Sequence, residues 1–296
     1  MNEIRAAKLY KSTIFVRMAH FLLLPLFFRD ILNLLGSGSF CPVSRFLGKK
    51  RGTIMDMLET LQCTVTEEEC DRQGYITVPD LVRHLVRAAT TRNRMEGCSK
   101  QVLMSELKAV WMFRRIIVRQ YRHLHAGDEL VGFASSRTVC GRHYAQQGDL
   151  YRDGELVARL NDVMMPVVLR GRRRLSCADT EPLFQVPALN EAEDFDPLPT
   201  IEDFPYTREK SFTMADCDAN GHYSTFDYPE LVCQLTGYYE GERPLVDHMQ
   251  VDFVKECVNG SVIRMGAIPQ GDGFKVQGQH ISTGKPAFNA YCVYKR

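Results

Sequence analysis

The sequence predicts an α+β protein made of two tandem units, each with one strand, one helix and a run of antiparallel strands. Two observations carry this prediction. The pattern DxxGxx[ST]xxD occurs at residues 71–80 and again at residues 218–227, each time at the start of a helical pattern. After each helix, segments rich in β-forming residues follow one another, separated by glycine-containing turns. A chain of 296 residues is long enough for each copy to bury its own core.

The first copy starts with a strand near Leu61, where "LQCTVTEEECD" is rich in β-formers and partly alternating. Thr77 and Asp80 predict a helix start with Pro79 in the first turn, and apolar residues recur at helical spacing up to Ala89. The strands expected after this helix are residues 106–121, 128–140, 143–152 and 156–170. The joints "HAGD" and "RDGE" contain glycine, which tolerates a positive φ in a turn.

The second copy repeats this order in fewer residues. A strand is expected at residues 206–214 and a helix at 224–239, followed by strands at 247–258, 261–269, 274–282 and 287–295. One strand, one helix and a series of antiparallel strands is the order of a hot-dog fold, in which a curled sheet wraps around a central helix. We therefore expect two tandem hot-dog domains, at residues 60–174 and 206–296, which together imitate a dimer. The chain is expected to be a monomer with this internal pseudo-dimer, or a homodimer.

Two segments lie outside the repeated units. Residues 175–205 are rich in proline and acidic residues and have little periodicity, which predicts an acidic linker. Residues 1–54 form an N-terminal extension whose longest apolar run, Phe21 to Phe28, contains Pro25 and is followed by Arg29. A bilayer span needs about 20 residues, so we expect no membrane span and a dispensable extension. An interfacial amphipathic helix is the alternative for this segment.

Composition excludes several functions. A net charge of +1 gives no global field that would attract nucleic acid, and no basic and aromatic residues are interleaved as in nucleic-acid-binding modules. The ten cysteines include no CxxC pair and no metal-ligand spacing. Such scattered cysteines are typical of reduced thiols in a cytosol. We therefore expect a cytoplasmic protein with no disulfide, no metal and no cofactor.

The richest polar motif precedes the second helix. Asp218, Asn220 and His222 form the pattern DxNxH there, whereas the first copy has Gln73 and Tyr75 in place of Asn220 and His222. An imidazole can give or take a proton near neutral pH, and a carboxylate or amide can orient it or a water molecule. Only the second copy retains these groups, so the sequence predicts one active site per chain.

With Asp216 before it and Glu256 and Cys257 after it, this motif resembles the acyl-ACP thioesterases of plants and bacteria, which carry DxDxNxHxNN and a later Glu-Cys strand. The resemblance covers residues 60–296, including "GD" at 127–128. Ser224 and Thr225 replace the paired asparagines, and both types can cap a helix. The resemblance implies a double hot-dog fold in which residues 60–174 bind the acyl chain. It also implies substrate contacts from Trp111, Arg172, Arg173 and Arg174.

The resemblance implies hydrolysis of fatty acyl-ACP to free fatty acid and holo-ACP in fatty acid biosynthesis. Peptide N–H groups of residues 220–225 are candidates to stabilise the oxyanion. Asp218, Asn220 and His222 would position groups and move protons, and Glu256 is the candidate base for water. Cys257 is either a nucleophile or a packing residue. Thiolate attack only exchanges one thioester for another and still needs a water step, so we favour direct attack by water.

Alternative functions stay open at this point. An acyl-CoA thioesterase would use the same arginines for the phosphates of coenzyme A. A hot-dog hydratase would use a related Asp and His, and a non-catalytic acyl-binding protein would be expected to lose the polar residues. Basic residues in 83–122 and at 170–174 favour an acidic acyl carrier protein as the partner.

Overall fold

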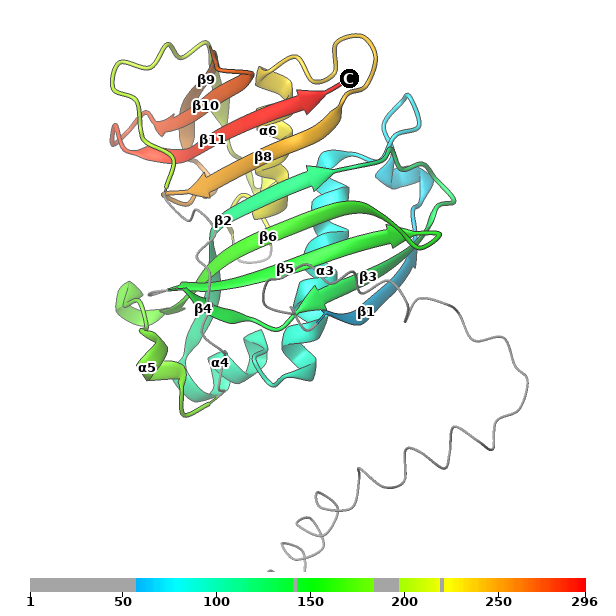
Figure 1. The fold of residues 1–296 in the computed structure, drawn as a ribbon. Helices are drawn as coiled ribbons and strands as arrows, with labels where there is room; N and C mark the ends of the chain where they lie inside the picture. The colour runs from blue at the N-terminus through cyan, green and yellow to red at the C-terminus, as the bar shows by residue number, and fades with distance from the viewer. Residues whose placement is uncertain (1–56, 141–142, 184–196, 219–220) are drawn as a thin grey trace, which may run out of the picture. The chain divides into compact units, whose positions relative to one another are not determined.

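The computed structural model describes residues 57–140, 143–183, 197–218 and 221–296. Within these ranges, one 11-stranded sheet has the order β1-β3-β5-β6-β2-β8-β11-β10-β9-β7, and β4 pairs with β5 beside this path. The order reads outward from the β2–β8 junction in the same way on both sides (Figure 1). The sheet therefore repeats the duplication that the sequence predicts.

The first half of the sheet surrounds α3 (Val78–Met95), the longest helix in the part of the chain that the structure describes. Thr77 caps this helix, because its side chain accepts a hydrogen bond from the Asp80 N–H at 3.2 Å, as predicted from the sequence. The other elements of this half are β1 (Met57–Thr64), α4 (Lys100–Leu107), β2 (Ala109–Gln120), β3 (Glu129–Ser135), β4 (Thr138–Cys140), β5 (His143–Arg152), β6 (Glu155–Val168) and α5 (Cys177–Thr180).

The second half has a shorter central helix, α6 (Tyr228–Leu235). Its strands are β7 (Arg208–Ser211), β8 (Leu245–Phe253), β9 (Val262–Gln270), β10 (Gly273–His280) and β11 (Pro286–Lys295). Gly127 and Gly260 occupy turns at matching places after β2 and β8. Their φ angles are 90° and 81°. Each glycine therefore serves a turn in which a side chain would be strained.

The two halves are joined through β2 and β8. These strands pair antiparallel from Arg115 opposite Asp252 to Val118 opposite Met249. One hydrophobic cluster includes Ile116 of β2 and buried residues of both halves, so the core is continuous across the joint. The two halves thus share a sheet and a core.

Two ion pairs also cross between the halves near the helix starts. Arg83 of α3 pairs with Asp80 at 2.6 Å and with Asp227 of the second half. Asp80 and Asp227 are the last residues of the two DxxGxx[ST]xxD patterns, so a single arginine holds equivalent positions of both copies. Arg243 of the second half pairs with Asp71, the first residue of the first pattern, at 2.6 Å.

The helices differ from the sequence prediction in two respects. The helix α4 was not predicted, although Ser99 accepts a hydrogen bond from the Val102 N–H and marks its start. The second helix was expected at 224–239 but extends over Tyr228–Leu235 only. A 3₁₀ turn, Thr225–Asp227, precedes it, and Gly237 with a φ of 70° follows its end.

Several strand bounds also differ. The first strand begins at Met57 rather than near Leu61, and the segment expected as one strand at 128–140 is divided into β3 and β4. The end of the expected linker contacts the second half, where the Leu198 N–H donates to Asp252 and the Lys275 ammonium donates to the Pro199 carbonyl. No helix among the described residues has the length and apolarity needed to cross a bilayer.

Candidate active site

The polar motif of the second copy folds into a tight turn. The Asp218 N–H donates to the His222 carbonyl at 2.8 Å, and the Gly221 N–H donates to the Asp218 carbonyl at 2.9 Å. The carboxylate of Asp218 accepts the His222 N–H at 3.2 Å. Gly221 has a φ of 78°, a conformation that glycine adopts without strain. Asp218 therefore builds the turn that carries His222. Asn220 lies outside the described residues, so its predicted role stays a prediction.

The first copy forms the same turn without the imidazole. The Asp71 N–H donates to the Tyr75 carbonyl at 2.8 Å, and the Gly74 N–H donates to the Asp71 carbonyl at 2.9 Å. The Asp71 carboxylate accepts the Tyr75 N–H at 3.2 Å. The repeated sequence pattern therefore encodes a repeated turn, and Asp71 has the same backbone role as Asp218.

Each turn is held against the segment that follows the first long strand after its helix. The Tyr223 N–H donates to the Cys257 carbonyl at 2.8 Å, and in the first copy the Ile76 N–H donates to the Leu124 carbonyl at 2.9 Å. His222 forms an isolated bridge with Val258 in the second copy. Glu256 and Cys257 thus correspond to His123 and Leu124 of the first half.

The central contact of the candidate site joins His222 to Glu256. The His222 Nε2 atom lies 3.2 Å from the Glu256 Oε2 atom. The His222 side chain is 39% exposed and the Glu256 side chain is 19% exposed, so a substrate at the surface can contact both. At the equivalent place in the first half, the rings of Tyr75 and His123 contact each other at a tilt of 53°, with their centroids 4.8 Å apart. The acid and imidazole pair is therefore present at only one of the two turns.

Arg172 brings the first half to this pair. Its guanidinium donates to the Glu256 Oε1 atom, while its own side chain is 71% exposed. Gly171 with a φ of 80° and Arg172 with a φ of 49° reverse the chain after β6 and aim the side chain at Glu256. Glu256 therefore has a different partner on each oxygen, imidazole on Oε2 and guanidinium on Oε1.

The position of Glu256 depends on where β8 ends. The sequence placed Glu256 and Cys257 on this strand, but the strand ends at Phe253. The Phe253 carbonyl accepts a hydrogen bond from Arg114 at 2.7 Å, and Arg114 lies at a register shift of β2. The residues after Phe253 no longer alternate as a strand does, so strand geometry does not fix where Glu256 and Cys257 point.

Cys257 lies in the core rather than at the surface. Its relative exposure is 0%, and burial raises the pKa of its thiol to about 11, although a hydrogen bond with Tyr228 opposes the shift. The corresponding residue of the first half, Leu124, is also fully buried. A thiolate is the nucleophilic form of cysteine. Of the two roles left open for Cys257, this environment favours packing.

The start of the second helix offers fewer peptide donors than the sequence suggested. The N–H groups of Gly221, His222 and Tyr223 already donate to other protein atoms. Ser224 accepts from the Phe226 N–H at 3.3 Å and caps the 3₁₀ turn, as expected of this residue type. The N–H groups of Ser224 and Thr225 have no acceptor recorded among the described residues, so they are the better candidates for binding an oxyanion.

The other predicted site residues are dispersed. The Trp111 indole donates to the Cys98 carbonyl at 2.9 Å inside the first half. Arg173 lies 3.6 Å from Asp179, and Arg174 bridges to Val167 at the end of β6. Among the described residues, Arg172 is the one of the three arginines that contacts a predicted catalytic residue. Sequence reasoning identified the arginines but missed the contact of Arg172 with Glu256, which no local pattern signals.

No protein-family model and no curated protein matches the chain. Its fold is similar to that of an acyl-ACP thioesterase from Bacteroides thetaiotaomicron, with a TM-score of 0.67 and 15% identity over 81% of this chain and 98% of that chain. It is also similar to the 12:0-ACP thioesterase from Umbellularia californica, with a TM-score of 0.66 and 15% identity over 81% and 97% of the two chains.

These likenesses confirm the predicted fold class. The chain is an α+β protein with two tandem hot-dog units, and its structural resemblance is to acyl-ACP thioesterases.

Proposed function

We propose that the protein hydrolyses acyl thioesters at the His222–Glu256 pair and that its substrate is a fatty acyl chain on acyl carrier protein. The observation that carries the proposal is the 3.2 Å contact between the His222 Nε2 and Glu256 Oε2 atoms beside a helix start. The fold shared with acyl-ACP thioesterases supports the same reaction class. The products would be free fatty acid and holo-ACP, as in fatty acid biosynthesis.

In the proposed mechanism, Glu256 removes a proton from a water molecule that attacks the thioester carbonyl. The N–H groups of Ser224 and Thr225 bind the oxyanion that forms on the carbonyl oxygen. Glu256 passes this proton to His222 across their contact. The carbon–sulfur bond then breaks, and His222 transfers the proton to the departing thiolate. Arg172 orients Glu256 through its other oxygen. Asp218 holds the turn that positions His222, and Asn220 is proposed to position the water or the carbonyl.

A basic surface near Glu256 supports acyl carrier protein as the carrier. Arg172 and Arg173 are 71% and 63% exposed and belong to the loop that contacts Glu256. This basic surface would attract an acidic carrier protein. The phosphates of coenzyme A would bind the same guanidinium groups, so an acyl-CoA thioesterase is the second candidate.

The test is a matched series of acyl-ACP and acyl-CoA substrates of equal chain length, with release of free thiol and free acid measured. The proposal predicts release of free thiol and free acid in equal amounts, with the higher kcat/KM for acyl-ACP. Higher kcat/KM for acyl-CoA would support the second candidate. No release of thiol from either series would contradict both and leave non-catalytic acyl binding.

A further inference from the structure

The interior of the first half contains a buried pair of an arginine and an aspartate that the proposed mechanism does not use. Arg137, in the segment between β3 and β4, and Asp162 of β6 are 2% and 1% exposed. Asp162 lies opposite Gln146 of β5 and Ile116 of β2 in the sheet register. Charged groups this deep in a protein are costly unless their partners are well placed.

The helix-facing side of the sheet contains this pair. Side chains two positions apart on a strand share a face, so Asp162 shares its face with Leu160, and Gln146 shares its face with Gly148. A side chain added at Gly148 would place its Cβ 3.0 Å from the Leu85 carbonyl of α3. This side of the sheet therefore packs against α3, and Asp162 points into the interior of the first half.

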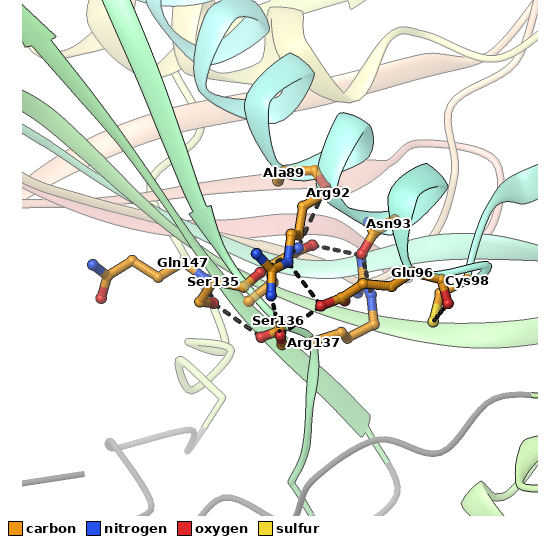
Figure 2. Close-up of polar contacts among 10 residues, drawn as sticks. Ala89, Arg92, Asn93, Glu96, Cys98, Ser135, Ser136, Arg137 and Gln147 are labelled. Atoms are coloured by element: carbon orange, nitrogen blue, oxygen red, sulfur yellow. Dashed lines mark hydrogen bonds and ion pairs between the residues drawn. The ribbon is translucent and has the colours of Figure 1, made fainter. Parts of the chain in front are cut away.

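Arg137 is held in place on several sides. Its Nε atom donates to the side-chain Oδ1 atom of Asn93 at 3.3 Å, and its Nη2 atom donates to Gln146 Oε1 at 3.0 Å. Its guanidinium also lies over the Trp111 ring, 4.5 Å from the centroid. Figure 2 shows Arg137 and Asn93 within the polar cluster at the end of α3. The orientation of Arg137 is thus fixed by contacts other than Asp162.

The pair itself is incomplete. The Arg137 Nη1 and Asp162 Oδ1 atoms lie 3.7 Å apart, and neither has a hydrogen-bond partner among the described residues. One atom is an unused donor and the other an unused acceptor, both fully buried. A hydroxyl group accepts one hydrogen bond and donates another, so it can satisfy both atoms at once. Burial also raises the pKa of Asp162 to about 6 despite the nearby guanidinium.

One face of β2 and β6 leads from the start of the second helix to the pair. The Phe113 ring lies 6.3 Å from the Phe226 ring, between centroids, and Phe226 belongs to the turn that starts the second helix. Phe113 pairs with Met164 of β6, and Asp162 is the next residue of β6 on the same face. Two residues of a strand span roughly 7 Å. Asp162 therefore lies about that distance beyond Met164, further from Phe226.

We propose that Arg137 and Asp162 form a polar subsite for a hydroxyl group on the acyl chain, so that the preferred substrates are hydroxyacyl thioesters. This inference rests on the proposed function for its location in the acyl-binding half. A wholly apolar chain would leave the donor and acceptor unsatisfied, whereas a hydroxyl at the matching carbon would hydrogen-bond to both.

The experiment compares unsubstituted acyl-ACP with hydroxyacyl-ACP of the same length, with the hydroxyl moved along the chain. The expected result is a kcat/KM at least about 10-fold higher for one hydroxyl position, the ratio that one or two buried hydrogen bonds give. The double variant Arg137→Met with Asp162→Leu should abolish this preference, because apolar residues of similar volume can replace a buried ion pair without loss of folding.

The matched control lies on the other face of the same two strands. Arg159 of β6 pairs with Asp149 of β5 at 2.7 Å, and Asp149 is 1% exposed. The double variant Arg159→Met with Asp149→Leu should keep the hydroxyacyl preference. Equal kcat/KM for both substrate types in the unmodified protein, or an unchanged preference in the Arg137→Met, Asp162→Leu variant, would overturn the subsite. Thermal melting of each variant confirms that it is folded before its kinetics are interpreted.

A binding measurement separates the subsite from the proposed function. Calorimetry with free hydroxylated and unsubstituted fatty acids in a His222→Ala variant needs no turnover. Tighter binding of the hydroxylated acid without hydrolysis by the unmodified protein would support the subsite and contradict the thioesterase proposal. Hydrolysis without any difference in binding would support the thioesterase and contradict the subsite.

Discussion

Arg115 and Asp252 form a buried two-point ion pair where β2 of the first half meets β8 of the second. The Arg115 Nε and Nη2 atoms donate to the two carboxylate oxygens at 2.5 and 2.9 Å. The residues are 3% and 1% exposed, and they lie opposite each other in the sheet register. Asp252 also accepts the Leu198 N–H, so the same carboxylate holds the segment that leads into the second half.

Replacing Asp252 by alanine should destabilise the whole described fold. The substitution leaves a buried guanidinium without its carboxylate, which typically costs about 3–5 kcal/mol. Urea unfolding monitored by circular dichroism measures this loss. The matched control is Glu155→Ala, because Glu155 and its partner Arg122 are 54% and 55% exposed. A surface pair is worth below about 1 kcal/mol, so equal losses in the two variants would contradict the assigned role of Asp252.

The proposed acid–base pair and the turn that holds it predict three slow variants. His222→Ala and Glu256→Gln should each lower kcat by about 100-fold or more, the range expected for general acid–base groups. Asp218→Asn should also reduce kcat by a similar factor, because the Asp218 carboxylate holds the turn that carries His222. Steady-state kinetics with acyl-ACP measure these losses. The control variant Arg122→Ala changes an exposed residue away from the pair, and kcat values of His222→Ala and Glu256→Gln close to it would contradict the mechanism.

Cys257 should be neither acylated nor required for turnover. Because burial raises the pKa of its thiol to about 11, iodoacetamide at pH 7.5 should leave it unmodified in the folded protein and modify it in urea. The partly exposed Cys217 serves as the comparison within the same chain. Cys257→Ala should keep measurable turnover. Mass spectrometry that detects an acyl group on Cys257 during turnover, together with an inactive Cys257→Ala variant, would establish it as the nucleophile instead.

The buried carboxyl of Asp162 should make stability depend on pH in an unusual direction. Burial raises its folded-state pKa from 3.8 to about 6, so the folded protein holds this proton more tightly than the unfolded chain does. Asp162 therefore favours the folded state most at pH below 4, and its contribution falls as pH rises from about 4 to 6. The free energy of unfolding, compared between the unmodified protein and Asp162→Asn at each pH, isolates this effect. The value for the unmodified protein minus that for Asp162→Asn should decrease as pH rises. A value that stays constant or increases with pH would contradict this effect.

The N-terminal extension should be dispensable, and the register of β1 makes this prediction sharper. Deleting residues 1–54 leaves all pairs from Met57 opposite Ser135 to Thr64 opposite Glu129 in place. Deleting residues 1–60 would remove Met57, Leu58 and Glu59 from that pairing. The shorter deletion should melt as the full chain does, and the longer one should melt at a lower temperature. Precipitation or a non-cooperative melt after the shorter deletion would contradict the predicted boundary at residue 54.

The repeated turn was predictable because it depends on local chemistry. Asp71 and Asp218 each accept the N–H of the residue four positions later, and each glycine takes a positive φ, so the pattern alone encodes the geometry. The helix cap at Thr77 was predictable for the same reason. These features require only residues that are close in sequence.

Contacts between distant segments were not predictable in the same way. Arg172 reaches Glu256 because β6 ends beside the segment that follows β8, which depends on the order of strands in the sheet. The orientation of Cys257 depends on β8 ending at Phe253, where Arg114 binds the last carbonyl. The buried pair of Arg137 and Asp162 was missed because charged residues in a β-pattern are normally assigned to the solvent side.

The continuous sheet across β2 and β8 makes assembly of the candidate site independent of protein concentration. Arg172 comes from one half of the chain, and His222 and Glu256 come from the other, so the candidate site needs both halves. In a dimer of separate subunits, dilution would separate the halves by mass action. Here covalent linkage keeps the second half at a high effective concentration near the first. Turnover per molecule should therefore be the same at nanomolar and micromolar protein.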